Sequence, residues 1–399
     1  MNPKLSHLTH DEIRALIRKY YDGEKIQQLI SEYQLNVKAS ELVKIFPPKV
    51  CDDLYCPYCS NTNLTLKYES RQYKSINNGI PECPVCRHVN NNNCNCGGCR
   101  ERKYVEKEKI DNRKKQLIND YNSSKILIST SVKDLTLENA IYLIALTRHS
   151  LSEDLRLVKI FDRTPVKFAP TEKLTEIILN SLYDSGLINI SPESNLDYFF
   201  FNEELTSITG YYPTRILWEF LPLLSIQEKR AFVAELERRL EDLFKNEEYN
   251  LASFKLWHLI WLHECIEYYY FLLESRSYPF EIIGDKTEAA FKSLIRKMSL
   301  GKIFNLSWQS IRNTVDFIKR KAIPQSQVAS VFTGILLRTM DRSLAEKWDL
   351  KDSRRDFSCS QTVISSTYFN LFLKLGDSAI KLVAPEIHNE DNFLNELES

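Results

Sequence analysis

The chain has 399 residues, of which 43% are hydrophobic and 27% charged, and this composition is typical of a soluble globular protein with two to four domains. Its 53 basic and 53 acidic residues cancel overall, but residues 1–125 carry 21 Lys and Arg against 15 Asp and Glu, so the front is basic and the remainder acidic. With ten glycines and neither a G-x-G-x-x-G nor a G-x-x-x-x-G-K-[ST] motif, the sequence excludes nucleotide-binding phosphate loops of those two types.

Two features of the sequence predict a cytoplasmic, intracellular protein. The first residues, Met-Asn-Pro-Lys, contain no apolar segment of the kind found in secretory signals. The most apolar run, residues 256–273, includes His258, His263, Glu264 and Glu267, which are too many ionisable groups for an ordinary membrane span. We therefore expect this run to be a buried helix, and we expect no membrane contact.

Residues 9–46 have the apolar spacing of three short helices, and Pro47 and Pro48 end the third because proline cannot continue a helix. This arrangement resembles a helix-turn-helix, with residues 38–46 in the position of the recognition helix. The resemblance implies DNA contacts by polar side chains of that helix: Lys38, Ser40 and Lys44. Packing of three helices would by itself produce the same apolar pattern.

Eight of the ten cysteines lie between residues 51 and 99. Four of them form two C-x2-C pairs: Cys56 with Cys59, and Cys83 with Cys86. Such a pair folds its chain into a tight turn that directs two thiolates at one metal ion. Residues 64–69, between the pairs, alternate between apolar and polar as a strand does. Two knuckles around a small antiparallel sheet resemble a zinc ribbon, and the resemblance covers about residues 51–100.

A third cluster, C-x-C-x2-C, follows directly and supplies three thiolates, so it needs a fourth ligand. His88 is the first choice for that ligand and Cys51 is the second. The predicted second site then consists of His88, Cys94, Cys96 and Cys99. An interleaved cross-brace, in which alternating pairs share each ion, is an alternative that the spacing leaves open. The sequence predicts two zinc ions in closed, structural sites rather than a disulfide framework, which needs an oxidising compartment.

Residues 101–125 form a predicted linker helix that is strongly charged. Residues 100–115 carry eight Lys and Arg against four Asp and Glu. In the functional interpretation the start of this helix is an arm that contacts DNA phosphates, through Arg100, Arg102 and Lys103. In the alternative interpretation it is a solvated linker, and the next domain begins near residues 122–124.

Residues 126–202 are predicted to form two helices and a hairpin, whose strands are residues 187–190 and 197–201. This pattern resembles a winged helix. The helix at residues 171–185, which would read DNA in a winged helix, carries three acidic residues against one lysine, and Glu193 lies at the wing tip. Because phosphate repels acidic surfaces, we expect this unit to contact protein or to be purely structural.

Residues 203–399 are predicted to be mostly helical, with an acidic tail from Pro385. The most catalytic-looking cluster outside the cysteine-rich segment is His258, His263 and Glu264. A metalloprotease helix carries its two histidines four residues apart on one face, whereas these are five apart. We therefore expect them to be core residues, and we predict no catalytic residue.

Together these patterns predict a mainly α, multidomain protein. Its segments are a three-helix helix-turn-helix (1–50), a zinc ribbon with a small antiparallel sheet (51–100), a charged linker helix (101–125), a winged helix (126–202) and an all-α domain with an acidic tail (203–399). No family is recognised for the whole chain.

The expected function is that of an intracellular DNA-binding adaptor or regulator. The front half would contact double-stranded DNA, and the helical back half would bind a protein partner or self-associate. One alternative is a protein–protein scaffold or subunit, for example of a mobile-element or phage-defence complex, in which zinc is a structural staple. The other is an enzyme with its site near residues 258–267.

Overall fold

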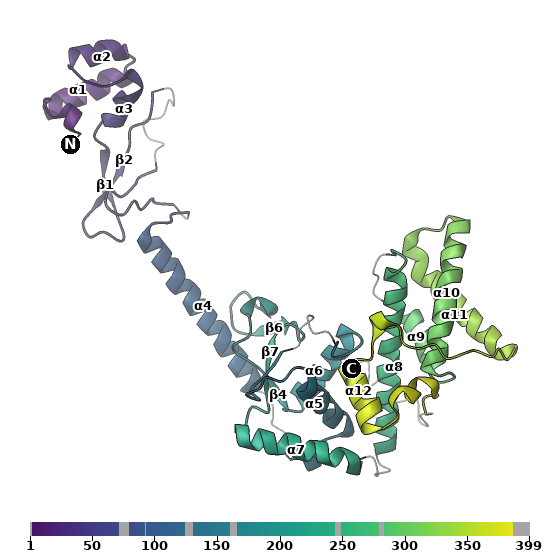
Figure 1. Ribbon diagram of the computed structural model, residues 1–399. Coiled ribbons are helices and arrows are strands. Elements are labelled where there is room, and N and C mark those ends of the chain that lie inside the picture. Colours follow the sequence, from purple (N-terminus) through teal and green to yellow (C-terminus); the bar gives the residue numbers. More distant parts are fainter. Residues whose placement is uncertain are drawn as a thin grey trace. The chain divides into compact units, whose positions relative to one another are not determined.

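The computed structural model describes residues 2–71, 80–91, 93–123, 131–159, 166–243, 249–278 and 283–385. The chain divides into two compact units, Met1–Asn112 and Arg113–Ser399 (Figure 1). It is mainly helical with small antiparallel sheets, so the expected fold class is confirmed at that level. The identities and boundaries of the predicted segments stay predictions.

The first unit begins with helices α1 (His10–Tyr21), α2 (Ile26–Glu32) and α3 (Leu42–Ile45). Helix α1 starts at a capping box, in which Thr9 and Glu12 exchange hydrogen bonds between side chain and backbone. The helices share one apolar core, and its buried residues include Leu5, Ile13, Leu16, Leu29, Leu42 and Ile45.

The third helix is shorter than the sequence pattern predicts. Residues Ala39–Glu41 form a 3₁₀ turn, and α3, which follows it, is four residues long. Neither element has a side-chain hydrogen bond at its N-cap, and Pro47 follows closely on the last helical residue. A helix is therefore present within the predicted residues 38–46, but it is shorter and partly 3₁₀, and its role as a recognition helix stays a prediction.

Strands β1 (Lys49–Tyr55) and β2 (Asn63–Leu66) form an antiparallel pair after the helices. Strand β2 lies where the sequence predicts a strand between the two cysteine pairs. Single bridges continue the pairing from Thr65 to Glu82 and from Glu82 to Val89, so the second knuckle is held against the small sheet. Beside this sheet, one buried cluster is formed by Cys56, Leu64 and Cys83.

Helix α4 (Gly97–Ser123) begins in the first unit and ends in the second (Figure 1). Every side chain from Arg100 to Ile110 is exposed. This stretch is therefore stabilised by its own hydrogen bonds and charges rather than by packing. Further along, Ile118 is buried in the apolar core of the second unit.

The second unit starts with α5 (Leu137–His149), β3 (Leu157–Lys159), α6 (Glu172–Asp184) and β4 (Ile188–Ile190). The strands β5 (Phe199–Phe201), β6 (Ile208–Tyr211) and β7 (Leu217–Phe220) come next. Strands β3, β7 and β4 form a three-stranded antiparallel sheet in that order, and β5 pairs separately with β6.

The hairpin predicted within residues 187–201 is wrong. Both of its strands exist, but β4 pairs with β7 and not with β5. Ile188 lies opposite Phe220 and Ile190 lies opposite Trp218, and all four side chains are fully buried. Strand β7 thus gives β4 an entirely apolar partner on the core side, and cross-strand apolar pairs of this kind stabilise a sheet.

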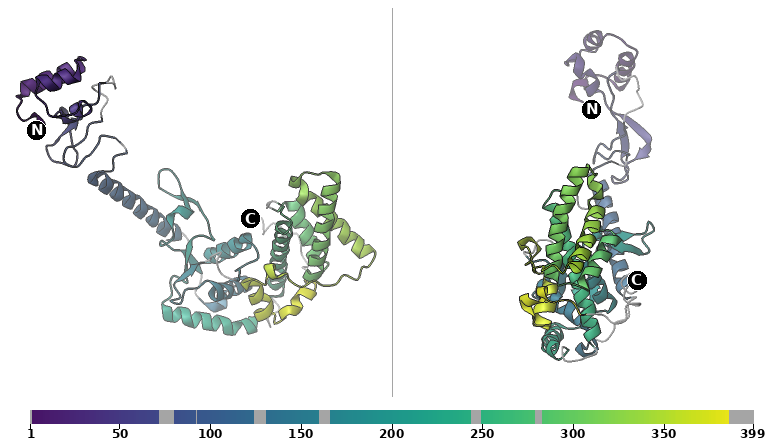
Figure 2. Two further views of the ribbon diagram at one scale, coloured as in Figure 1. Left: turned by 45° about the horizontal axis from the view of Figure 1, so that its top comes forward. Right: turned by 90° about the vertical axis from the view of Figure 1, so that its right-hand side faces the viewer.

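The longer helices of the second unit are α7 (Ile226–Leu243), α8 (Tyr249–Glu274), α9 (Asp285–Ile295), α10 (Leu300–Lys321) and α11 (Val328–Ala345). Helix α8 packs against α5, α9 and α10, and α10 and α11 lie side by side (Figure 2). A short helix, α12 (Val363–Ser366), continues into a π-helix, Thr367–Phe372. Within the described ranges, no helix is long and apolar enough to cross a membrane. The predicted acidic tail beyond Pro385 lies outside the described residues.

Candidate functional site

Two groups of metal-ligating side chains stand out in the part of the chain that the structure describes, and both lie in the first unit. The first group is Cys56, Cys59, Cys83 and Cys86, and the second is His88, Cys94, Cys96 and Cys99. Within each group the ligand atoms lie within 4.8 Å of one another. This grouping matches the sequential allocation and differs from the interleaved cross-brace. Cys51 belongs to neither group and is half-buried in β1.

The first group is built by two turns beside the small sheet. The N–H of Cys56 donates to the carbonyl of Thr62 at 2.9 Å, which closes the first knuckle. In the second knuckle, the N–H of Arg87 donates to the carbonyl of Cys83 at 3.0 Å, and Arg87 has a left-handed φ of 61°. The sulfurs of Cys56 and Cys86, one from each turn, lie 3.5 Å apart. Two local turns thus bring four thiols to one point.

The second group joins the chain after the second knuckle to the start of α4. Nδ1 of His88 lies 3.3 Å from the sulfur of Cys99 and 3.7 Å from that of Cys96. The sulfur of Cys94 accepts the backbone N–H of Val89 at 3.4 Å. Hydrogen bonds from the N–H groups of Cys96 and Val89 lower the pKa of the Cys94 thiol to about 6, which favours the thiolate that binds metal.

The donor sets decide which metal fits and what it can do. Four thiolates, or three thiolates with one imidazole, are ligand sets of structural zinc. Each group supplies four donors, so a tetrahedral ion there has no open position for a reacting water. All eight side chains are buried or half-buried, as a structural ion requires. The chemistry that zinc would supply here is cross-linking of the chain.

The residues predicted to contact DNA lie in two places in the first unit. They are Lys38, Ser40 and Lys44 beside or within the short helical turns, and Arg100, Arg102 and Lys103 at the start of α4, and all six are exposed. Arg102 forms a solvent-exposed ion pair with Glu106 at 3.8 Å, and Lys103 donates to the carbonyl of Cys94 at 3.3 Å. DNA contact by any of the six stays a prediction.

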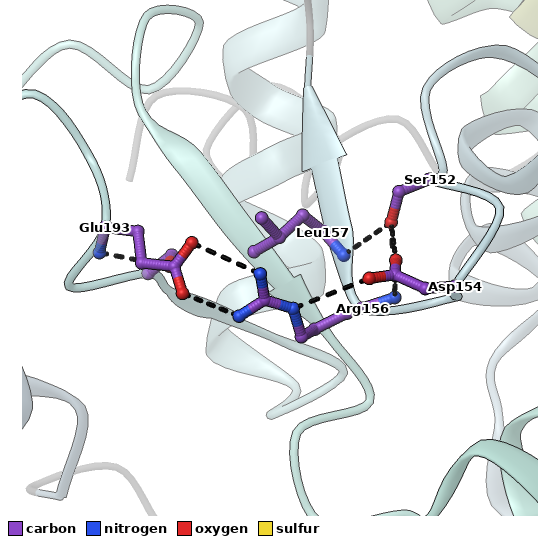
Figure 3. Close-up of polar contacts among 6 residues, drawn as sticks. Ser152, Asp154, Arg156, Leu157 and Glu193 are labelled. Atoms are coloured by element: carbon purple, nitrogen blue, oxygen red, sulfur yellow. Dashed lines mark hydrogen bonds and ion pairs between the residues drawn. The ribbon is translucent and has the colours of Figure 1, made fainter.

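Glu193, in the turn predicted to be the wing tip, forms an ion pair with Arg156. Arg156 donates to both carboxylate oxygens of Glu193, at 2.6 and 3.3 Å (Figure 3). Its Nε also lies 3.6 Å from Asp154. The Arg156 hydrogen bonds lower the pKa of the Glu193 carboxyl. Sequence reasoning missed this base because it precedes Glu193 by 37 residues. The pair is half-exposed, so it neutralises the turn more than it stabilises the fold.

The two histidines of α8 bind separate partners. Nε2 of His258 lies 2.9 Å from the carbonyl oxygen of Pro385, and Nδ1 of His263 lies 2.6 Å from the hydroxyl of Thr171. These contacts hold other segments of the second unit against α8, which gives each histidine the core role expected from the sequence.

The two buried carboxylates of α8 are held by basic residues from distant segments. Arg355 contacts both oxygens of Glu264, the nearer at 2.7 Å, and Ser365 donates to the same carboxylate at 2.5 Å. Lys167 binds Glu267 at 2.6 Å. These partners lie 91 to 101 residues away along the chain, which is why no local pattern could identify them.

Comparison with known proteins does not assign a family. No family model matches the chain, and no solved structure matches it. An uncharacterised protein of Rickettsia conorii is 27% identical over 73 residues, which are 18% of this chain and 86% of that protein. This similarity covers too little of the chain to carry a function to it.

We expect the purified protein to contain two zinc ions, because the ligand atoms form two sets of four. Chelation should unfold residues 51–100, since the free energy of metal binding is folding free energy in such a segment. All five tryptophans lie in the second unit, so their emission should stay unchanged while elemental analysis records the loss of metal. A metal-free protein whose first unit stays folded would contradict this prediction.

Substitution separates the two candidates for the fourth ligand of the second site. We expect His88→Ala to lose one zinc ion and Cys51→Ala to keep both, because His88 lies in the second group and Cys51 lies outside it. Elemental analysis of the two variants side by side measures this, and each variant is the control for the other. Loss of an ion from Cys51→Ala with retention in His88→Ala would show the allocation to be wrong.

Stability of the second unit should depend on pH through His263. Burial lowers the pKa of this imidazole from 6.5 to about 4. In the unfolded chain the His263 imidazole therefore takes up a proton near pH 6.5, whereas in the folded unit it does so only near pH 4. The stabilisation is present above about pH 6.5 and is lost as the pH falls toward 4.

We expect His263→Asn to be less stable than the wild type at about pH 8, yet to lose less stability on acidification. The two slopes should differ by up to about 1.4 kcal/mol per pH unit, which corresponds to one proton. Urea unfolding followed by tryptophan emission measures the second unit alone, and substitution of the exposed His10 is the control. Identical pH dependence in wild type and His263→Asn would reject the assignment.

Proposed function

We propose that this protein is an intracellular DNA-binding adaptor or regulator whose front half is held together by two structural zinc ions. In this proposal the first unit contacts double-stranded DNA, and the helical second unit binds a protein partner or a second copy of the chain. The comparisons give no support for DNA binding, so the proposal rests on the geometry and charge of the first unit.

The observation that carries the proposal is the position of Cys99, which is the third residue of α4. A metal ion on Cys99 fixes the start of this helix, and the residues that follow include the basic Arg100, Arg102 and Lys103. The helix is exposed from there as far as Ile110. A rigid, exposed and basic helix start suits contacts to phosphate, which depend on positive charge and not on base sequence.

The topology of the second unit supports a protein-binding role. The order α5, β3, α6, β4, β7, with β7 between the other two strands, resembles a winged helix in which the β5–β6 hairpin takes the place of the wing. Phe200 on this hairpin and Tyr212 directly after it are each 49% exposed, and their rings lie 5.1 Å apart. Exposed aromatic side chains are typical of protein interfaces, whereas the acidic surface of α6 would repel phosphate.

A scaffold that makes no DNA contact is the second candidate. Exposed apolar side chains in the first unit favour it: Val50, Tyr55 and Val85 are each at least half-exposed. Apolar side chains of this kind would suit a protein partner. An enzyme with its site near residues 258–267 is the third candidate. The four polar side chains there each bind a separate structural partner, which argues against an active site.

Binding of the full-length protein to duplex DNA should weaken steeply as salt rises, because each phosphate contact releases counterions. The triple variant Arg100→Ala, Arg102→Ala, Lys103→Ala should bind more weakly and keep both zinc ions. Its plot of log affinity against log salt should be shallower by about 0.9 for each phosphate contact that is lost. Fluorescence anisotropy of a labelled duplex across a salt series measures this slope.

The matched control removes the same charge from the second unit. Lys319, Arg320 and Lys321 are exposed at the end of α10, and their joint substitution by alanine should leave the slope unchanged. Equal losses in the two triple variants would show that net charge, rather than the start of α4, governs binding. Absence of DNA binding by the wild type would reject the DNA assignment and favour the scaffold.

A further inference from the structure

One aromatic side chain joins the two metal-ligating groups. Tyr58 lies inside the first knuckle, between Cys56 and Cys59, yet its ring and hydroxyl contact the second group. The ring meets that of His88 edge to face, with centroids 5.2 Å apart and planes at 84°. The hydroxyl oxygen lies 3.4 Å from the sulfur of Cys99. A residue of one knuckle thus touches two ligands of the other site.

The start of α4 is shaped around the same ring. A Cβ on Gly98 would lie 2.4 Å from Cγ of Tyr58. That ring atom is next to the Tyr58 Cβ, so it cannot move away without moving the whole side chain. A Cβ on the neighbouring Gly97 would meet no atom within 4 Å. Glycine at position 98 is therefore what allows the ring to cover the helix start between Cys96 and Cys99.

We propose that Tyr58 is a positioning residue that couples the two sites, so that metal at the four-cysteine site raises the metal affinity of the second. This inference rests on the zinc part of the proposed function and is independent of DNA binding. Metal on Cys56 and Cys59 closes the first knuckle, and the closed knuckle fixes the direction of Tyr58. The fixed ring then holds the His88 imidazole and the start of α4 where their ligand atoms converge.

The hydroxyl adds a second contribution. In the metal-bound state Cys99 is a thiolate, so the Tyr58 O–H can donate to its sulfur. Outer partners of this kind orient metal ligands, and their loss typically weakens metal binding ten- to a hundredfold. Because coupling between two binding sites is reciprocal, metal at the second site favours the first by the same factor.

The backbone offers a competing route between the sites. The N–H of Cys83 donates to the carbonyl of His88 at 2.7 Å, which links the second knuckle to a ligand of the second site without Tyr58. The experiment must therefore separate the side chain from the backbone. Substitutions at Tyr58 and Gly98 do so because neither removes this hydrogen bond.

Cobalt(II) titration of the full-length, reduced, metal-free protein tests the coupling. Cobalt bound by four thiolates absorbs at different wavelengths from cobalt bound by three thiolates and one imidazole, so the two sites report separately. In the wild type the two signals should rise together. In Tyr58→Ala the four-thiolate signal should still appear, with a midpoint shifted by no more than the lost coupling, whereas the second signal should rise separately and need at least about tenfold more free cobalt.

Three further variants define the cause. Tyr58→Phe keeps the ring and loses the hydroxyl, so its loss of second-site affinity should be smaller than that of Tyr58→Ala. Gly98→Ala should reproduce Tyr58→Ala because the added Cβ displaces the ring. Gly97→Ala adds a Cβ to the same helix turn in open space, and it should behave as wild type.

An unchanged second site in both Tyr58→Ala and Gly98→Ala would overturn the proposal and assign any coupling to the backbone bond. Loss of the four-thiolate signal in Tyr58→Ala would also overturn it, because Tyr58 would then serve its own knuckle. Absence of both cobalt signals in the wild type would instead reject the zinc part of the proposed function. The three failures are thus distinguishable in one titration series.

Discussion

Coordination of a metal ion by thiolates would be the interaction on which the cysteine-rich segment depends. The structure describes six buried residues in this segment, and all of them except Leu64 belong to the two metal-ligating groups. Burial of one leucine contributes about 1.5–3 kcal/mol, whereas ordering the backbone costs about 1–2 kcal/mol for each residue. Hydrophobic burial therefore cannot hold some fifty residues in one conformation. Binding of a structural zinc ion, at about 10–16 kcal/mol, would contribute several times more than burial of this leucine.

The second unit is instead stabilised by the burial of apolar side chains. Helix α8 is apolar around most of its circumference, and Trp261 and Tyr269 on it are fully buried. The two buried carboxylates of this helix are tolerable because each is paired, whereas an unpaired carboxylate in either position would be strongly destabilising. Glu264 with Arg355 and Glu267 with Lys167 also fix which segments dock on α8. Residues that look catalytic in the sequence thus have a sufficient structural explanation.

The features that the sequence predicted well are those that local spacing determines. A C-x2-C pair closes its own turn, so the knuckles and the strand between them follow from residues a few positions apart, whereas the choice between the sequential and the interleaved grouping of the ligands does not. The features that it missed depend on contacts between distant residues. The pairing of β4 with β7, and of Glu193 with Arg156, joins segments about thirty or more residues apart.

A signal for the first of these existed in the sequence. Residues 216–221 form a short apolar run interrupted only by Glu219, as in a buried strand, and this run would have suggested a partner for β4. The contacts of Tyr58 had no such signal. A residue between two cysteines of one knuckle gives no indication that its ring covers a ligand of another site. The shortened third helix was missed for a further reason, since apolar spacing records which residues are buried and not how far the helix extends.

The second metal-ligating group also governs the helix that follows it. Residues 100–110 of α4 gain nothing from packing, and an isolated helix of such length is marginal in water. The helix is anchored by Cys99 in its first turn and, further along, by the burial of Ile118. Thiolates at a helix N-terminus are favoured by the helix dipole, and the N–H of Cys99 donates to the sulfur of Cys96 at 3.5 Å. Metal bound at this site would therefore cap α4, and its loss would let the turn that bears Arg100 and Arg102 fray.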